Sequence, residues 1–416
     1  METIHREVSY PSRINARMRD FSDAKGSTMG LRMLRLALYL LLCAFGQGVL
    51  AANAPIIPPP PSIAASSYLL LDADTHKVLV EHNLHEPLPQ ASLTKIMTSY
   101  VAAAELAAMR IKEDDQVPIS VKAWQTPGSR MFIREGTRVS VGDLMRGIII
   151  QSGNDASVAL AEYIAGSEDA FADMMNQQAL ELGMSSTQFV NSTGLPDEGH
   201  YTSVWDLALL TRSLITRFPE VYALYAQREF IYNDIPQPNR NRLLWRDKTV
   251  DGVKTGHTQA AGYCLVASAL RGNMRLVSVV MGTESDEARM RESQKLLSYG
   301  FRYFETRKLY EAGVPLKTAE LWYGDAEEIE LGVLEDVYVT IPRGHYNDIK
   351  AELKIARVIE APAEAGQEFG ELRLLLGGDV AYRAPLVALA DAGEAGVFSR
   401  MGDFIYLFFG SLFSSD

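Results

Sequence analysis

The chain has 416 residues, of which 47% are hydrophobic and 22% are charged, and its formal net charge at pH 7 is −12. This length is enough for a large domain and a small one, each with its own hydrophobic core. The acidic excess argues against nucleic acid as a partner, and the seven histidines form no spaced cluster of the kind that binds a metal. Nothing in the sequence calls for a cofactor.

Residues 29–54 have the parts of a secretory signal peptide: two arginines near the start, an apolar run at 36–45, and a small-x-small cleavage site at the end. The apolar run is too short to span a bilayer, which makes an uncleaved anchor the weaker alternative. A signal counted from Met29 has the usual length, so we expect translation to start there and residues 1–54 to be absent from the exported protein. A cytoplasmic extension over residues 1–28 is the alternative.

A proline-rich linker at 55–65 leads into the predicted catalytic domain at 66–316. This domain begins with a hairpin of strands at 68–72 and 77–81. Apolar periodicity then predicts helices at 92–109, 141–151, 155–165, 170–182 and 204–216. Two apolar strands at 263–270 and 274–281, joined by a turn, are followed by a helix at 287–304.

The pattern of apolar residues changes after the catalytic domain. Short apolar segments separated by glycine and proline predict a small all-β domain, a β-sandwich, at 317–391. The last segment, 392–416, predicts an amphipathic helix whose aromatic face would anchor the protein at a membrane surface through residues 397–413. Its apolar run is too short to cross a bilayer, and packing onto the β-domain or a second copy is the alternative.

Three short motifs follow one another along the chain: S-L-T-K at 92–95, S-G-N at 152–154 and K-T-G at 254–256. An S-x-x-K pair alone arises by chance about once in a chain of this length. The three motifs together, in this order and 60 and 102 residues apart, indicate separate elements of one domain that converge on a cleft.

The first motif pairs a nucleophile with a base. Ser92 is predicted at the start of a helix, and Lys95, three residues on, lies on the same face. Ser92 could be a simple N-cap, but a lysine opposes the positive end of the helix dipole. Burial and the dipole would instead lower the pKa of Lys95, so that a neutral amine takes the proton of Ser92. The backbone N–H of Ser92 can stabilise the developing oxyanion.

The other two motifs supply proton transfer and substrate binding. Ser152 can relay a proton between Lys95 and the leaving group, and Asn154 can orient Lys95 or a substrate amide; the alternative is that either residue caps the next helix. The K-T-G motif is predicted on a strand that edges the cleft, where a peptide could add as a further strand. Lys254 and Thr255 would bind a carboxylate there, with an exposed turn as the alternative.

Gly256 would leave room for the ligand backbone beside that strand. The histidines offer no such pattern. We expect His200 and the other scattered histidines to be surface or core residues rather than catalysts.

The chain resembles the low-molecular-mass penicillin-binding proteins of the type 5/6 group, which are D-alanyl-D-alanine carboxypeptidases. The resemblance rests on the three motifs, on K-T-G-H-T and the A-G-Y that follows it, on the N-R-N at 239–241, and on V-Y-V-T-I-P-R at 337–343. It covers nearly all of residues 66–413. It implies an α/β (α+β) penicillin-recognising serine transferase domain, β-lactamase/transpeptidase-like, then a small all-β domain and a C-terminal amphipathic helix.

The resemblance also implies an activity and a place. The enzyme would remove the terminal D-alanine from peptidoglycan stem pentapeptides through an acyl-enzyme on Ser92, and β-lactam antibiotics would acylate the same serine. It would lie on the outer, periplasmic face of the cytoplasmic membrane. Lys95 would be the base, with Ser152 and Asn154 as the second motif.

Further residues follow from the same resemblance. Lys254 and Thr255 would hold the substrate carboxylate, and Gly256 would lie beside them. His257 would supply the second oxyanion N–H through its backbone. Two arginines, Arg240 and Arg289, would lie near the carboxylate.

Three other functions stay open on the sequence. A β-lactamase needs a positioned carboxylate for deacylation, and Asp197 and Glu198 lack a Glu-x-x-Leu-Asn pattern. A D,D-endopeptidase would cut cross-linked peptides with the same residues. A non-catalytic cell-wall binding protein would hold stem peptides without turning them over.

Overall fold

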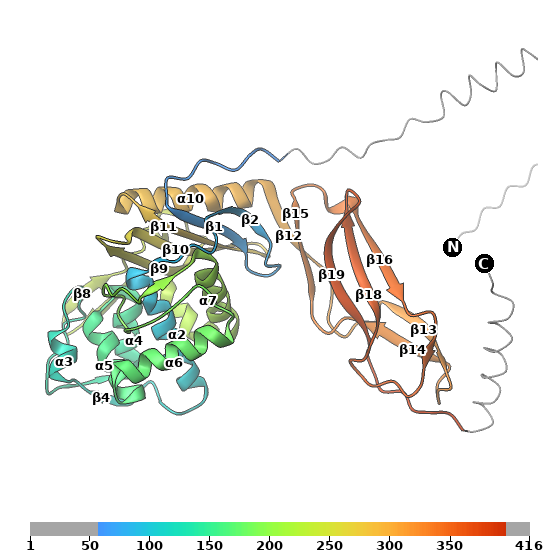
Figure 1. Cartoon of the computed structure of the whole chain (residues 1–416), viewed down its shortest axis with the longest axis horizontal. Coiled ribbons are helices and arrows are strands. Elements are labelled where there is room, and N and C mark those ends of the chain that lie inside the picture. Colours follow the sequence, from blue (N-terminus) through green and yellow to red (C-terminus); the bar gives the residue numbers. More distant parts are fainter. Residues whose placement is uncertain (1–56, 397–416) are drawn as a thin grey trace, which may run out of the picture. The chain divides into compact units, whose positions relative to one another are not determined.

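The computed structural model describes residues 57–396 (Figure 1). The predicted signal peptide and residues 397–413 of the predicted C-terminal helix lie outside the described residues. No helix within the described part of the chain is long and apolar enough to cross a membrane.

An antiparallel sheet of five strands forms the centre of the α/β region, in the order β2-β1-β11-β10-β9. The strands are β1 (Ser67–Asp72), β2 (Val78–His82), β9 (Val250–Thr258), β10 (Gly262–Arg271) and β11 (Met274–Thr283). Helix α10 (Asp286–Tyr303) covers one face and the other helices gather on the opposite face (Figure 1). Buried side chains therefore fill both faces of the central strands, which explains their nearly continuous apolar sequence. Strand β9 lies at the edge of the sheet.

The helical face contains most of the remaining helices. They are α2 (Lys95–Ala107), α3 (Val121–Gln125), α4 (Val141–Arg146), α5 (Asn154–Ala165), α6 (Glu168–Glu181), α7 (Val204–Arg217), α8 (Pro219–Tyr222) and α9 (Leu243–Arg246). Short strand pairs connect them: β3 (Leu88–Pro89) with β6 (Tyr201–Thr202), β4 (Gln116–Pro118) with β5 (Arg138–Ser140), and β7 (Glu229–Tyr232) with β8 (Ile235–Pro238).

Serine N-caps set the starts of five helices. In each case the hydroxyl accepts a hydrogen bond from the backbone N–H three residues on, which satisfies a donor that the first helical turn leaves free. The capping residues are Ser120, Ser140, Ser167, Ser203 and Ser285, for α3, α4, α6, α7 and α10.

Two predicted helices differ from the structure at the ends that carry the motifs. The helix predicted from residue 92 begins as a 3₁₀ turn, η1 (Ala91–Thr94), and becomes α-helical only at Lys95. The helix predicted over 141–151 is α-helical only in α4 and then widens into a π-helix, η2 (Gly147–Gln151). Such local departures from the α-helix recur at functional sites.

The β-rich region has two sheets. Its larger sheet has the order β16-β18-β19-β14-β13-β17, and β12 pairs with β15 in the smaller one. The strands are β12 (Phe304–Tyr310), β13 (Lys317–Trp322), β14 (Glu328–Gly332), β15 (Val337–Pro342), β16 (Ile349–Ile355), β17 (Ile359–Glu360), β18 (Glu368–Leu376) and β19 (Asp379–Ala388). A 3₁₀ turn, η4 (Tyr346–Asp348), precedes β16.

The first strand of this region begins earlier than the predicted domain boundary at residue 317. Strand β12 is antiparallel to β15 from Phe304 onward. Its sequence, FETRKLY, places charged residues on both faces of the strand and shows no clean alternation, so it carries little strand signal. Tertiary pairing with the apolar β15 supplies what the local pattern lacks.

Candidate active site

Ser92 and Lys95 lie where η1 packs against β9. Their side chains face each other, with Lys95 Nζ 3.3 Å from Ser92 Oγ, as the spacing predicted. Gly256 on β9 permits this packing: a Cβ there would lie 3.2 Å from both the Ala91 Cβ and the Gln90 carbonyl oxygen. The glycine of the K-T-G motif therefore lets β9 pack closely against the turn that carries Ser92.

Lys95 is fully buried, and its amine has three oxygen neighbours. Besides Ser92, it contacts Asn154 Oδ1 at 2.7 Å and the Thr193 carbonyl oxygen at 2.5 Å. Burial lowers the pKa of Lys95 to about 7; the carboxylate of Asp155 opposes the shift, and the charge of Arg240 adds to it. A neutral amine has two N–H donors, which these two carbonyl oxygens use, so its lone pair is left for the Ser92 hydroxyl.

The second motif joins the π-helix to α5. Ser152 has a left-handed backbone with φ of 67°, and its Oγ is buried without a hydrogen-bond partner among the described residues. Asn154 is the first residue of α5, and its Nδ2 donates to the Pro127 carbonyl at 2.6 Å while its Oδ1 accepts from Lys95. Gly153 holds the N-cap position, and no side chain caps this helix. Neither Ser152 nor Asn154 therefore caps α5, the helix that follows the motif.

Asp155, which the sequence reasoning did not single out, anchors the second motif. Its buried carboxylate accepts hydrogen bonds from four backbone N–H groups, those of Met131, Phe132, Ile133 and Ala156. These contacts fix the loop before α4 against the start of α5. An acid in the first turn of a helix directly after S-G-N was the available signal.

Lys254 is buried on β9, and its amine donates to the Thr255 carbonyl oxygen at 3.0 Å. Burial holds the pKa of Lys254 well below its usual value, and the positive charges of Lys95, Arg240 and Arg289 lower it further. Four basic side chains therefore act on one another at the cleft of an acidic protein. Such a concentration of positive charge suits an anionic group of the substrate.

The two predicted arginines have different surroundings. Arg240 donates from Nε to the Gln151 carbonyl oxygen at 3.0 Å, next to the second motif. Arg289 is buried; its Nη1 donates to the Gly256 carbonyl oxygen at 2.9 Å, and its Nη2 pairs with Asp286. Arg289 thus supports the backbone of the third motif and already has an acidic partner.

His257 follows the K-T-G motif on β9, and its exposed ring stacks on Tyr263 of β10 with centroids 4.0 Å apart. The stacking fixes the end of β9 that leads away from Lys254. The side chain of His257 is thus engaged in packing, while its backbone lies on the edge strand.

His200 is buried behind the first motif. Its contact with Thr94 is another one that the sequence did not reveal. The Val190 N–H donates to its Nδ1 at 3.1 Å, which assigns the ring proton to Nε2, 2.6 Å from Thr94 Oγ1. Thr94 in turn donates to the Ala91 carbonyl oxygen at 2.8 Å. Burial lowers the pKa of His200 to about 4, so the ring stays neutral and braces the turn that contains Ser92.

A cavity of about 560 Å³ opens beside this turn. Its lining combines residues next to Ser92 with the end of β9 and the loop that follows Thr193, and includes Ala91, Gly194, Leu195, Asp197 and Thr258. Within residues 57–396 no group of histidine, cysteine and acidic side chains could hold a metal ion.

Comparisons with known proteins agree with this geometry. A family model described as D-alanyl-D-alanine carboxypeptidase matches residues 54–285, and a model for the C-terminal domain of penicillin-binding protein 5 matches residues 304–394. The second match begins at β12, as the sheet pairing does.

Two curated relatives illustrate the likeness. D-alanyl-D-alanine carboxypeptidase DacC of Escherichia coli is 45% identical over 85% of this chain and 92% of its own length. DacF of Bacillus subtilis is 40% identical over 82% and 90%. An E. coli D-alanyl-D-alanine endopeptidase is more distant, at 29% identity over 70% of this chain.

Among solved structures, penicillin-binding protein 5 of Haemophilus influenzae superposes with a TM-score of 0.79 at 42% identity, covering 81% of this chain and all of that one. The matched residues span both the α/β region with its three motifs and the β-rich region. The chain therefore belongs to the D-alanyl-D-alanine carboxypeptidase family of serine peptidases and has the two-domain fold of penicillin-binding protein 5.

Proposed function

We propose that this protein is a serine carboxypeptidase that releases the terminal D-alanine of peptidoglycan stem pentapeptides. The observation that carries the proposal is the buried amine of Lys95, 3.3 Å from Ser92 Oγ, with a pKa of about 7 and two carbonyl oxygens that occupy its N–H donors. A neutral amine in this position is the base that a serine nucleophile needs near neutral pH.

Acylation begins when Ser92 Oγ attacks the carbonyl carbon of the penultimate D-alanine and its proton passes to Lys95. The backbone N–H groups of Ser92 and His257 stabilise the oxyanion. Ser152, whose buried hydroxyl lacks a partner in the described structure, passes the proton on to the departing amine. The peptide bond breaks, free D-alanine leaves, and the tetrapeptide remains as an ester on Ser92.

Deacylation needs one water molecule. Lys95 accepts a proton from the water as it attacks the ester carbonyl, and the proton returns to Ser92 Oγ as the tetrapeptide carboxylate forms. A β-lactam follows the same first step, except that its ring opens and no fragment leaves. In the described structure the hydrogen-bond partners of Lys95 include no carboxylate, so we expect slow release of a bound penicillin, unlike in a β-lactamase.

The positions of the basic residues near β9 indicate the direction in which a substrate peptide would bind. Lys254, Thr255 and the nearby Arg240 would hold the terminal carboxylate in the positive part of the cleft. The peptide then passes Ser92, and its earlier residues reach the cavity at the other end of β9, beside Thr258 and Leu195. This direction presents the last peptide bond to the nucleophile.

The proposed location rests on sequence alone. The signal at 29–54 would export the protein, and residues 397–413 would attach it peripherally to the periplasmic side of the inner membrane. Cell fractionation of the full chain and of a chain ending at residue 391 checks this proposal. The full chain should pellet with membranes and be released at alkaline pH, and the shorter chain should remain in the periplasm; equal pelleting of both would contradict attachment through the tail.

The deciding experiment measures D-alanine release from a stem pentapeptide by wild type, Ser92→Ala and the matched control Ser185→Ala, a serine exposed on the helical side. We expect release by wild type and by the control, and none by Ser92→Ala. Release that persists without Ser92 would refute the proposed nucleophile. Penicillin labelling without release from the pentapeptide would instead favour an endopeptidase or a lactam hydrolase, and absence of both would favour a binding protein.

A further inference from the structure

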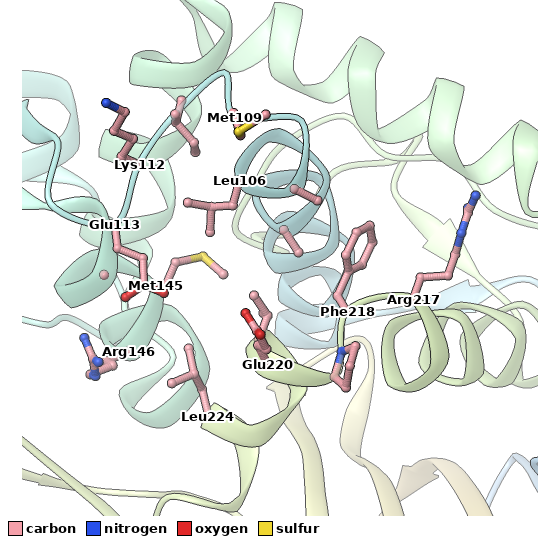
Figure 2. Close-up of a pocket in the computed structure, with 16 residues that line it drawn as sticks. Leu106, Met109, Lys112, Glu113, Met145, Arg146, Arg217, Phe218, Glu220 and Leu224 are labelled. Carbon is pink, nitrogen blue, oxygen red and sulfur yellow. The ribbon is translucent and has the colours of Figure 1, made fainter.

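A second cavity lies in the helical part of the α/β region. It has a volume of about 570 Å³ and is formed by the last turns of α2, by α4, and by the segment from the end of α7 to η3 (Ala223–Ala226) (Figure 2). No residue that we assign to catalysis or substrate binding lines it. Its volume is within the range of about 300–1,000 Å³ that is typical of small-molecule sites.

Apolar side chains form the walls of this cavity. Leu106, Met145, Phe218 and Leu224 converge on one space from separate elements (Figure 2). Met109, at the rim, is 84% exposed, so apolar surface at the mouth of the cavity faces water. A ligand with an apolar body would remove this surface from water.

The charge that faces the space is negative. The carboxylate of Glu220 points between Leu106 and Leu224, and that of Glu113 lies beside Met145 (Figure 2). Within residues 57–396, neither carboxylate has an ion pair or a side-chain hydrogen bond. Both are therefore available to a bound cation.

Two of the three basic side chains at the rim, those of Lys112 and Arg217, are turned away from the space (Figure 2). Arg217 donates to the Tyr100 hydroxyl at 3.0 Å, and Arg146 lies 3.8 Å from Asp143. Figure 2 shows the amine of Lys112 and the guanidinium of Arg217 directed away from the space. Among the basic residues of the lining, only Arg146 lies near a carboxylate of the space: its Nη1 and Glu113 Oε2 would lie 3.2 and 3.6 Å from a Cβ on Gly142. With Glu113, Glu220 and the neighbouring Asp143, negative charge still exceeds positive charge there.

We propose that this cavity is a second ligand site, which takes a small apolar molecule that carries one positive charge, such as an alkylammonium or arylalkylammonium ion. The apolar body packs among the side chains from α2, α4 and η3, and the ammonium group lies between Glu113 and Glu220. This combination of shape and charge discriminates against neutral and anionic molecules of the same size.

The site is placed to communicate with the catalytic cleft. Helix α2 begins at Lys95 and its last turns line the cavity, while α4 runs from the cavity into the π-helix that ends next to Ser152. A ligand that favours one arrangement of these helices changes acylation at Ser92. The free and the acylated protein should then differ in their affinity for the ligand, because coupling between two sites is a difference in binding free energy.

The test is calorimetric titration of the full mature chain with 4-phenylbutylammonium, and with the uncharged 4-phenylbutanol as the matched ligand. We expect one site and at least about fivefold tighter binding of the ammonium ion, the effect of roughly one partly exposed charge pair. The double variant Glu113→Gln/Glu220→Gln should lose that preference, and Glu328→Gln in the β-rich region should keep it. Equal binding of both ligands, or a double variant that retains the preference, would overturn the proposal.

A filling variant, Leu224→Trp, locates the site independently of charge. Its folding is checked by penicillin labelling and thermal unfolding, and Leu224→Met serves as the conservative control. Loss of ammonium binding by a folded Leu224→Trp variant supports the assignment, whereas wild-type affinity contradicts it. Repeating the titration on penicillin-acylated protein tests the coupling, which an unchanged Kd would refute. None of these measurements depends on release of D-alanine.

Discussion

The α/β region buries charge at its cleft, whereas the β-rich region keeps its charged side chains at the surface. Lys95, Lys254 and Arg289 are 0%, 2% and 8% exposed. In the described residues from 304 onward, the buried polar side chains are two threonines, Thr306 and Thr340. The ion pairs of that region, such as the one between Lys308 and Asp336, are open to solvent.

The difference indicates that the buried charges of the α/β region serve the reaction and not the stability of the fold. Burial of a cation disfavours its charged form, so a fold gains nothing in stability from placing two lysines in its interior. The α/β region accepts this cost where the lysines gain lowered pKa values that are useful for proton transfer. Apolar clusters form the interior of the β-rich region, and nothing in the charge pattern of its described residues points to an active site.

The largest effect is expected from removing the buried base. In Lys95→Met the side chain stays unbranched and is only one atom shorter, but no amine can accept the proton of Ser92. The rate of acylation by penicillin should fall about 10³-fold, within the range of general-base effects. Stopped-flow acylation measures this, with circular dichroism to confirm folding. A loss of less than tenfold in a folded variant would mean that another group is the base.

A pH titration of the wild type tests the same lysine without mutation. With a pKa of about 7, Lys95 is mostly protonated below neutral pH and cannot accept a proton. The acylation rate should therefore rise about tenfold per unit up to pH 7 and level off above it, so that at pH 5 it is about 100-fold below the plateau. A rise that continues toward pH 10 would show that burial does not lower the pKa of Lys95.

The cleft also depends on a close backbone contact between Gly194 and Ala91, and we expect its disruption to have a smaller effect than the loss of Lys95. A Cβ on Gly194 would lie 1.8 Å from the Ala91 carbonyl oxygen, and the φ of this glycine is +83°. Gly194→Ala should therefore destabilise the protein by about 3 kcal/mol and displace the turn that carries Ser92. Chemical unfolding and penicillin labelling measure the two effects.

Gly183→Ala is the matched control for that change. Gly183 has a similar φ of +74°, but open space surrounds its Cβ position. We expect Gly183→Ala to lose about 1 kcal/mol of stability, because alanine is disfavoured in the left-handed backbone conformation. Penicillin should label this variant as it labels the wild type. Equal losses in the two variants would show that the contact with Ala91 is unimportant.

The sequence predicted much of this site because its strongest signals are local. The Ser92 to Lys95 spacing places the two side chains on one face, and the apolar periodicity predicted the starts of the helices within a few residues. The order of the three motifs predicted their convergence.

Long-range contacts explain what the sequence did not reveal. One of the two carbonyl oxygens that accept from Lys95 belongs to the backbone of Thr193, 98 residues away, and a backbone carbonyl leaves no mark in the sequence. His200 reaches Thr94 across 106 residues, without any motif around it. Arg289 was expected beside the substrate carboxylate, and only the fold shows its pairing with Asp286 and the Gly256 carbonyl.

The smallest effect is expected where the β-rich region carries charge. Lys308 and Asp336 are 2.7 Å apart, but solvent reaches both side chains and screens their attraction. Lys308→Met should therefore leave both thermal unfolding and acylation at Ser92 unchanged within error, whereas the same exchange at Lys95 slows acylation about 10³-fold. Calorimetry and penicillin labelling of the two variants side by side measure the contrast. A clear drop in the unfolding temperature of Lys308→Met would mean that charge also stabilises the β-rich region, and burial of charge would then no longer distinguish the catalytic region from its neighbour.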